Sequence, residues 1–470
     1  MTTLAWNTEE SAAVLPEEQA SSFLIGAPTD AQITDKLLDP ILHPPKWLAP
    51  AMLVTGLGST LLFVLLTYTL VTGVGVWGNN IPNAWAFAIT NFVWWIGIGH
   101  AGTFISAFLL LLEQKWRTSI NRFAEGMTLF AIVQAGLFPL MHLGRAWFFY
   151  WLIPYPSTMR VWPQFRSSLT WDVAAVTTYF TVSLVFWYLG LVPDLAIVRD
   201  RAPTLMRRRI YGIFALGWYG SATQWSRYRV AYGLLAGLAT PLVISVHSIV
   251  SMDFAIDIVP GWHSPIFPPY FVAGAIFSGF AMVLTLMIPA RALYKLQNVI
   301  TEKHLDNMSK MLLLTSLIVT YSYLVEGFTA WLSGDKYERY IYLFARPRGP
   351  YAICYWTVIF CNCVAPQTLW FRKFRVSPKL LWCVTIFIQI GMWLERFTLI
   401  VSSTTNDRVP SGWEIYRPSV IDIGILSGTI FFFLFLFLCF LRWVPFIPIS
   451  EIKELARQKA HELAQKEAEA

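Results

Sequence analysis

Ten runs of about 20 mostly apolar residues are distributed along this chain of 470 residues. A run of that length is what an α-helix needs to cross the hydrocarbon core of a bilayer, which is about 30 Å thick. Only 13% of the residues are charged, whereas a soluble domain carries about 25%, so lipid must cover much of the surface. We predict an all-α polytopic membrane protein with helices at 47–76, 84–112, 123–152, 168–192, 229–252, 266–290, 309–332, 350–371, 378–402 and 419–442.

The Lys and Arg residues between these runs predict the orientation of the chain. With the N-terminus inside, the inner loops hold 18 Lys and Arg residues and the outer loops hold 8. Cytoplasmic loops carry the excess of positive charge in membrane proteins, so we expect both termini in the cytoplasm. The same clustering accounts for the net charge of +7, and no nucleic-acid partner is expected.

The order of the runs predicts an internal repeat. Four crossings restore the direction of a chain, so helices two to five and helices six to nine have the same orientation. His142 and Glu326 lie near the outer ends of the third and seventh helices, and His247 and Glu395 match in the fifth and ninth. We therefore predict two pseudo-repeated four-helix bundles with a peripheral helix on each side. The expected segments are a cytoplasmic N-terminal stretch 1–46, helix 47–76, bundles 84–252 and 266–402, helix 419–442 and a cytoplasmic charged tail 443–470.

Three segments outside the membrane have their own patterns. Residues 203–227 are basic and amphipathic, and we expect them to lie along the inner membrane surface. The stretch 450–470 predicts a charged helix in solvent, with partner docking as the alternative. The polar, acidic residues 1–46 contain no apolar core behind a basic start, so no cleavable signal peptide is expected.

The five cysteines predict packing rather than cluster binding. All of them lie in apolar stretches, and none forms a CxxC motif. Cys361 and Cys363 are two residues apart, which places them on nearly opposite faces of a helix. An iron–sulfur cluster needs closely spaced thiolates, so this chain is not expected to hold one, and no metal site is expected.

Several ionisable side chains lie inside the apolar runs. A charge at the bilayer centre costs about 2.5–3.5 kcal/mol, so such residues are candidates for function. Each also has a structural alternative: a histidine can be a hydrogen-bonded packing residue, and an aspartate at a helix start can favour the helix dipole. The adjacent Glu395 and Arg396 are expected to point apart and to pair with other helices. The candidates are His100, His142, Asp172, His247, Asp253, Glu326, Glu395 and Arg396.

The strongest candidate pair is His142 with Asp172. The third helix runs outward to PLMHLGRAWFFYWLIPYP and the fourth returns from SSLTWD, so both side chains are expected at similar depth near the outer face. A quinol that gives up two electrons also releases two protons, which an imidazole and a carboxylate can accept. Phe138 and Trp171 could pack its ring, with Arg145 beside the pocket or extended to the interface.

Two other functions use similar residues. A transporter also places carboxylates and histidines inside a bundle, but matching short helices broken by Gly or Pro are not evident in the two halves. A haem-b protein needs paired axial histidines on facing helices. Only His100, His142 and His247 lie inside the predicted spans, so one haem is conceivable and two are not.

The stretches NNIPNAWAFAITNFVWWIGIGHAGTFISAFLLL, QAGLFPLMHLGRAWFFYWLIPYP and RSSLTWD carry a family resemblance. With them, the chain resembles the polysulfide reductase/NrfD-like membrane subunits of quinone-linked redox complexes. Within that family it is most similar to the ActC subunits of alternative complex III. The resemblance extends over nearly the whole chain, and its most specific motifs lie within residues 80–175.

The resemblance implies a subunit of the bacterial inner membrane that binds menaquinol near the periplasmic face, at His142 and Asp172. It implies electron transfer to an extrinsic periplasmic iron–sulfur subunit and on to multihaem cytochrome c subunits, with no haem or cluster on this chain. It also implies a second NrfD-like membrane subunit, the paralogue ActF, in the same complex and in contact with lipids. Since ActF has the same architecture, this chain could alternatively be an ActF-like, proton-translocating subunit without a quinol site. Proton movement is implied for His100, His247, Asp253, Glu326, Glu395 and Arg396.

Overall fold

The computed structural model describes residues 22–152 and 168–469, and within them every regular element is helical. Among these described residues, ten helical segments are long and apolar enough to cross a membrane. This confirms the prediction of an all-α polytopic membrane protein. The ten segments are α3 (Leu48–Thr72), α4 (Ala86–Leu111), α5 (Asn121–His142), α6 (Ser168–Arg201), α8 (Ala222–Ala255), α9 (Phe267–Leu293), α10 (Glu302–Leu332), the combined Ala352–Trp370, α15 (Pro378–Thr405) and α16 (Val420–Trp443).

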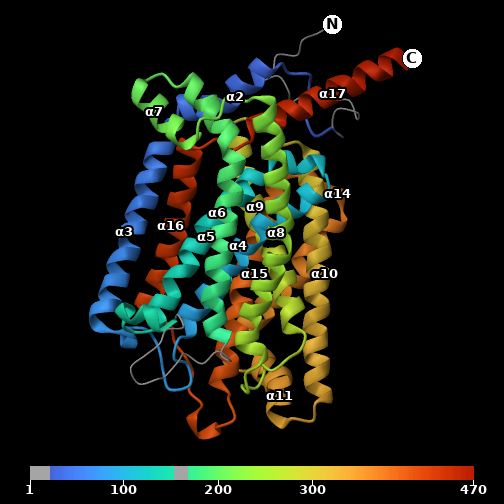
Figure 1. Ribbon diagram of the computed structural model, residues 1–470. Helices are drawn as coiled ribbons and strands as arrows, with labels where there is room; N and C mark the ends of the chain where they lie inside the picture. Colours follow the sequence, from blue (N-terminus) through green and yellow to red (C-terminus); the bar gives the residue numbers. More distant parts are fainter. Residues whose placement is uncertain (1–21, 153–167, 470) are drawn as a thin grey trace.

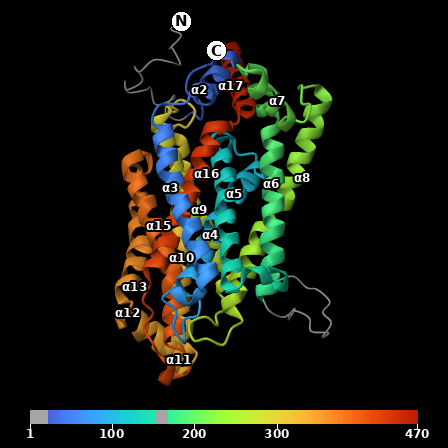
Figure 2. The same ribbon diagram turned by 90° about the vertical axis from the view of Figure 1, so that its left-hand side faces the viewer.

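The long helices run side by side, and short elements mark the two ends of the bundle (Figure 1). One end, here the α7 end, carries α2 (Asp30–Leu42), α7 (Leu205–Phe214) and α17 (Ile449–Glu469). The opposite end, here the α11 end, carries α11 (Lys336–Tyr340). Helices α3 and α16 pack on each other at one side of the bundle (Figure 2). The repeat of two four-helix bundles stays a prediction.

Helix α4 is the centre of the packing, because α5, α8, α9 and α15 all contact it and most of its residues are buried. Its glycines allow this close approach. A Cβ atom on Gly102 would lie 2.0 Å from the carbonyl oxygen of Ala124 on α5. A Cβ atom on Gly279 of α9 would lie 1.8 Å from that of Ala101 on α4. Small residues let helix backbones pack tightly in membranes, which explains the glycine-rich stretch of α4.

The third span is shorter than predicted. Helix α5 ends at His142 rather than near residue 152. Gly144 then adopts a φ of +70°, a left-handed conformation in which glycine is the favoured residue after a helix. A 3-10 helix, η3 (Ala146–Leu152), follows. Arg160 and Arg166 are two of the eight Lys and Arg residues counted in the predicted outer loops, and both lie outside the described residues.

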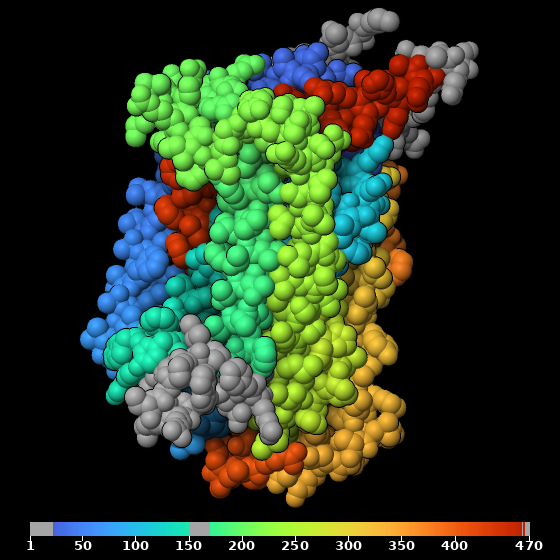
Figure 3. Space-filling view, in the orientation of Figure 1, coloured from blue at the N-terminus to red at the C-terminus, as the bar shows by residue number. Residues whose placement is uncertain are grey.

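The basic segment 203–227 forms α7 and the start of α8 at the α7 end, where the space-filling view places α7 on the outer surface (Figure 3). The tail is helical as predicted, but the expectation that solvent surrounds it is wrong for its first turns. Ile449 and Ile452 are buried. Glu451 forms an ion pair with Arg117 at 2.8 Å. Burial alone would lower the pKa of Arg117, but the Glu451 carboxylate raises this pKa above its ordinary value, so the guanidinium group stays charged.

Candidate functional site

His142 lies at the C-terminal end of α5, inside a cluster of aromatic rings. The ring of Trp85 stacks on it, with 5.1 Å between ring centroids and 16° between the planes. Trp77, Phe92 and Phe138 surround it with centroid distances of 6.3–6.4 Å. Its Nε2 atom is buried and has no hydrogen-bond partner among the described residues. This nitrogen is therefore available to accept a proton from a molecule that reaches it.

Asp172 lies on α6, just beyond the first turn as the structure describes that helix, so the helix-start alternative does not account for it. Its side chain is buried and faces the carboxyl group of Asp253 on α8, close enough for the two charges to interact. Two carboxylates in one buried site repel each other, and a proton shared between them relieves this repulsion. Such a pair can pass a proton between its members.

A cavity of about 440 Å³ lies at the α11 end, between the start of α4 and the end of α8. Trp85, which stacks on His142, and Asp253, which faces Asp172, both line it. Ile89 and Trp262 provide apolar walls. Neither His142 nor Asp172 lines this cavity, but each neighbours one of its lining residues, at the same end of the bundle.

The other residues predicted for this pocket differ in exposure. Phe138 is buried and contacts the His142 ring. Trp171 is 51% exposed and Arg145 is exposed. Sequence reasoning missed the role of Trp77 and Trp85, because tryptophans at the ends of spans are also typical of the interfacial belt. The position of Trp85 directly before α4 was the available signal.

The candidates His100 and His247 meet at mid-bundle, between α4 and α8. Their Nδ1 atoms are 3.2 Å apart. His100 also contacts the carbonyl oxygen of Ile96 through Nδ1 at 2.7 Å, and its ring stacks on Tyr179 with 4.6 Å between centroids. In this arrangement the two imidazoles contact each other directly instead of facing a porphyrin held between them.

Glu395 and Arg396 do not point apart as expected: they form an ion pair at 2.7 Å. The expected contacts with other helices are present for the carboxylate. It accepts hydrogen bonds from the hydroxyl groups of Tyr270 and Tyr323, and from the side-chain amide of Asn362 at 3.2 Å. Asn362 lies in a π-helical turn, η5 (Ile359–Val364), a local irregularity often found at functional sites.

Glu326 lies nearer the α11 end, opposite Arg346 at 3.7 Å. Both line a cavity of about 340 Å³ that Glu395, Tyr342 and Tyr355 also line. The guanidinium group of Arg346 lies 4.1 Å from the centroid of the Tyr342 ring. Arg346 is one of the eight Lys and Arg residues counted in the predicted outer loops, but it is 5% exposed and lines this polar cavity.

A buried ionic cluster near the α7 end was not predicted. Arg122 contacts the carboxylates of Glu125 and Asp194, each at 3.4 Å, and all three side chains are 1% exposed. The sequence suggested Arg122 as an inner-loop cation and gave no role to Glu125. The signal that could have identified the cluster is the spacing of Arg122 and Glu125, which puts both on one face of α5.

Comparison with known proteins identifies the family. The family model described as polysulphide reductase, NrfD, matches residues 75–406, which is more than two-thirds of the chain. This chain belongs to the NrfD family. A putative dimethyl sulfoxide reductase membrane subunit from Halobacterium salinarum is 27% identical over 238 residues, which cover 48% of this chain and 50% of that protein. The chain thus spans about half the length of the curated relative it matches.

Proposed function

We propose that this NrfD-family chain is the quinol-oxidising membrane subunit of an electron-transfer complex. One observation carries the proposal: His142 and Asp172 each neighbour a lining residue, Trp85 and Asp253 respectively, of the same cavity of about 440 Å³. The cavity combines apolar walls with a few polar groups, as sites for small organic ligands do. The relative's name, which places it in the membrane part of a reductase, agrees with a redox role.

The chemistry needs two proton acceptors. A quinol that leaves as a quinone releases two electrons and two protons. Asp253 faces the cavity, so its carboxylate can accept one hydroxyl proton and share it with Asp172. His142 Nε2 can accept the other once the indole of Trp85, which precedes α4, turns away from the imidazole. Both groups then need a route for protons to the aqueous phase at the α11 end.

The finer assignments follow from this site and the family. We propose menaquinol as the substrate and an extrinsic periplasmic iron–sulfur subunit as the electron acceptor, with multihaem cytochrome c subunits beyond it, as in alternative complex III. The α11 end would then face the periplasm of a bacterial inner membrane, and both termini the cytoplasm. The two pseudo-repeated bundles and a second NrfD-like subunit belong to the same proposal.

The test compares His142→Gln and Asp172→Asn with matched variants at the opposite end, His43→Gln and Asp200→Asn, whose side chains are well exposed. Positioned acids and bases contribute about 10²–10⁴-fold to rate. In the assembled complex, we expect quinol-dependent reduction of the acceptor to fall at least about 100-fold for the first pair and to stay unchanged for the second. Wild-type turnover in Asp172→Asn, with normal assembly, would remove the site assignment.

A second candidate function, proton movement through the bundle, is favoured by two groups of buried polar residues inside it. The His100–His247 contact and the Glu395 cluster lie on adjoining helices, and the ring of Phe271 lies between them. It is 6.0 Å from the His247 ring by centroid and 4.2 Å from the guanidinium of Arg396. We propose that protons pass along these groups, whether or not this chain binds quinol.

This second function has a separate measurement. The complex is placed in liposomes, and quinol turnover is compared with proton uptake or release for Glu395→Gln and for Glu414→Gln, an exposed glutamate on the α11 side. We expect Glu395→Gln to lower the number of protons moved per electron and Glu414→Gln to leave it unchanged. An unchanged ratio in Glu395→Gln would contradict a proton route through this cluster.

A further inference from the structure

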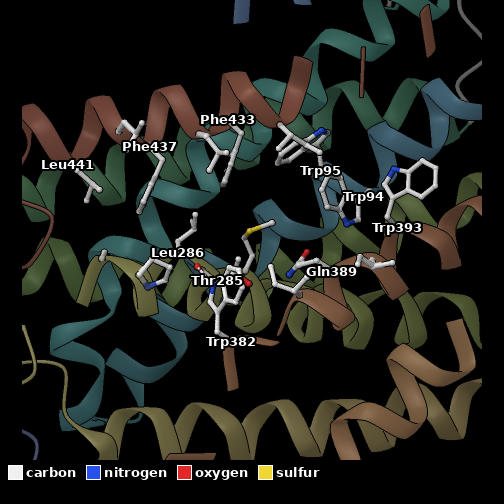
Figure 4. Close-up of a pocket in the computed structure, with 18 of the residues that line it drawn as sticks. Trp94, Trp95, Thr285, Leu286, Trp382, Gln389, Trp393, Phe433, Phe437 and Leu441 are labelled. Carbon is white, nitrogen blue, oxygen red and sulfur yellow. Dashed lines mark hydrogen bonds between the residues drawn. The ribbon is translucent and has the colours of Figure 1, made fainter. Parts of the chain in front are cut away.

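A long apolar groove lies between α4, α9, α15 and α16, apart from the cavities at the α11 end. Its volume is about 660 Å³. Figure 4 shows aromatic and aliphatic side chains from these helices turned toward its interior. Residues of α16 line it from Leu426 to Leu441, so it extends from near the middle of the bundle to the α7 end.

The dimensions of the groove decide what class of molecule it can hold. At a rise of about 1.5 Å per residue, the stretch 426–441 of α16 is about 22 Å long. A volume of about 660 Å³ over that length gives a mean width of about 6 Å. A helix with its side chains is about 10–12 Å wide, so a transmembrane helix of another protein could enter the groove only with its side chains. The width suits one or two hydrocarbon chains.

The lining agrees with a hydrocarbon occupant. Two lining residues, Thr285 and Gln389, have a side-chain hydroxyl or amide group, and both direct donors to nearby groups, whereas Gln389 Oε1 has no hydrogen-bond partner among the described residues. The Thr285 hydroxyl donates to the carbonyl oxygen of Ala281 at 2.8 Å, and the Gln389 amide donates to that of Ser278 at 2.7 Å. Methylene groups in the groove would therefore contact mainly rings and aliphatic side chains.

The mouth of the groove at the α7 end has the opposite character. Trp47 and Trp382 are among its lining residues, and two exposed lysines are their neighbours in the sequence: Lys46 directly before Trp47 and Lys379 one turn before Trp382. The Tyr294 ring packs on Trp47 with 5.6 Å between centroids, and its buried hydroxyl has no hydrogen-bond partner among the described residues. Cationic side chains at membrane level attract anionic lipid head groups.

We propose that this groove binds an anionic phospholipid, with a fatty acyl chain between α16 and α9 and the phosphate at Lys46 and Lys379. The site is independent of the proposed quinol site, because its lining residues and its polar end are different. A phospholipid held there would join the α3–α16 pair to the rest of the bundle.

The test uses the full chain reconstituted in nanodiscs of equal parts phosphatidylglycerol and phosphatidylcholine, then transferred to mild detergent for native mass spectrometry. We expect the wild type to retain one phosphatidylglycerol. Two variants, Ile430→Trp and Leu434→Trp, fill the groove and should lower this occupancy at least tenfold, whereas Leu57→Trp, on a lipid-facing part of α3 outside the groove, should not.

A second pair of variants tests the head group without altering the groove. Lys46→Gln with Lys379→Gln should make phosphatidylglycerol and phosphatidylcholine equally retained. Arg208→Gln with Arg209→Gln removes the same charge from exposed α7 at the same end and should keep the preference. Three outcomes would each overturn the proposal. The wild type and the groove variants could retain phosphatidylglycerol equally, or the wild type could show no preference for phosphatidylglycerol over phosphatidylcholine. The third is recovery of an isoprenoid quinone instead of a phospholipid.

Discussion

Gly102 and Gly136 are both helical glycines, yet their surroundings differ. A Cβ atom on Gly102 would lie 2.0 Å from the backbone oxygen of Ala124, whereas nothing lies within 4 Å of a Cβ atom on Gly136. A backbone atom cannot move away as a flexible side chain can, so the contact at Gly102 controls the α4–α5 distance.

Alanine substitution should separate these two positions. Overpacking costs about 1–3 kcal/mol, and we expect Gly102→Ala to lower the free energy of unfolding by about that amount. Gly136→Ala should be neutral or stabilising by up to about 1 kcal/mol, because alanine favours the helix. Thermal unfolding of the purified chain in one detergent measures both. Equal midpoints for the two variants would contradict the close contact.

Among the elements, α17 shows how one helix can have two environments. Its first turns are buried, and Ser450 donates from its backbone N–H and its hydroxyl to Asp194, at 3.0 and 2.6 Å. Asp194 is also a partner of buried Arg122. Further along, the contact of Glu462 with Lys115 lies on the surface. The start of α17 thus closes the ionic cluster of α5 and α6, and its distal part does not.

Two changes to α17 should therefore have unequal effects. Ile452→Ala empties a fully buried position and should cost about 2–5 kcal/mol. Deletion of residues 461–470 removes the Lys115–Glu462 surface contact, and exposed pairs contribute at most about 1 kcal/mol. Chemical unfolding in detergent micelles is the measurement. A deletion as damaging as Ile452→Ala would show that the distal part is packed as well.

At the scale of the whole molecule, the two ends differ in what they expose. The α7 end carries arginines on an amphipathic helix, and the α11 end carries the cavities that Trp85 and Glu326 line. The excess of basic residues predicts that the α7 end faces the cytoplasm. The proposed quinol site would then lie near the opposite face, where an extrinsic electron acceptor could reach it.

Single cysteines can test this orientation in intact cells. After replacement of the five native cysteines, Arg208→Cys marks the α7 end and Arg339→Cys marks the α11 end, both at exposed positions. A membrane-impermeant maleimide should label Arg339→Cys in intact cells and Arg208→Cys only after lysis. The reverse pattern would put the proposed quinol site on the cytoplasmic side.

The amino-acid sequence alone determined the architecture, because bilayer thickness gives each apolar run a required length. The ten spans followed from that requirement. The ionisable residues inside them could also be identified from the sequence, because charged side chains are rare in the hydrocarbon core. The end of α5 was missed because hydrophobicity continues through η3, whereas the left-handed Gly144 stops the helix.

Only the tertiary structure decided which of these residues meet. Periodicity along one helix carries no information on the facing helix, so the contacts of Asp172 with Asp253 and of His100 with His247 were not predictable. Neither was the pairing of Glu395 with Arg396: adjacent side chains leave a helix in different directions, but the long guanidinium side chain can turn back. Burial of Arg122 likewise depends on two carboxylates brought by packing, which is a long-range property of the fold.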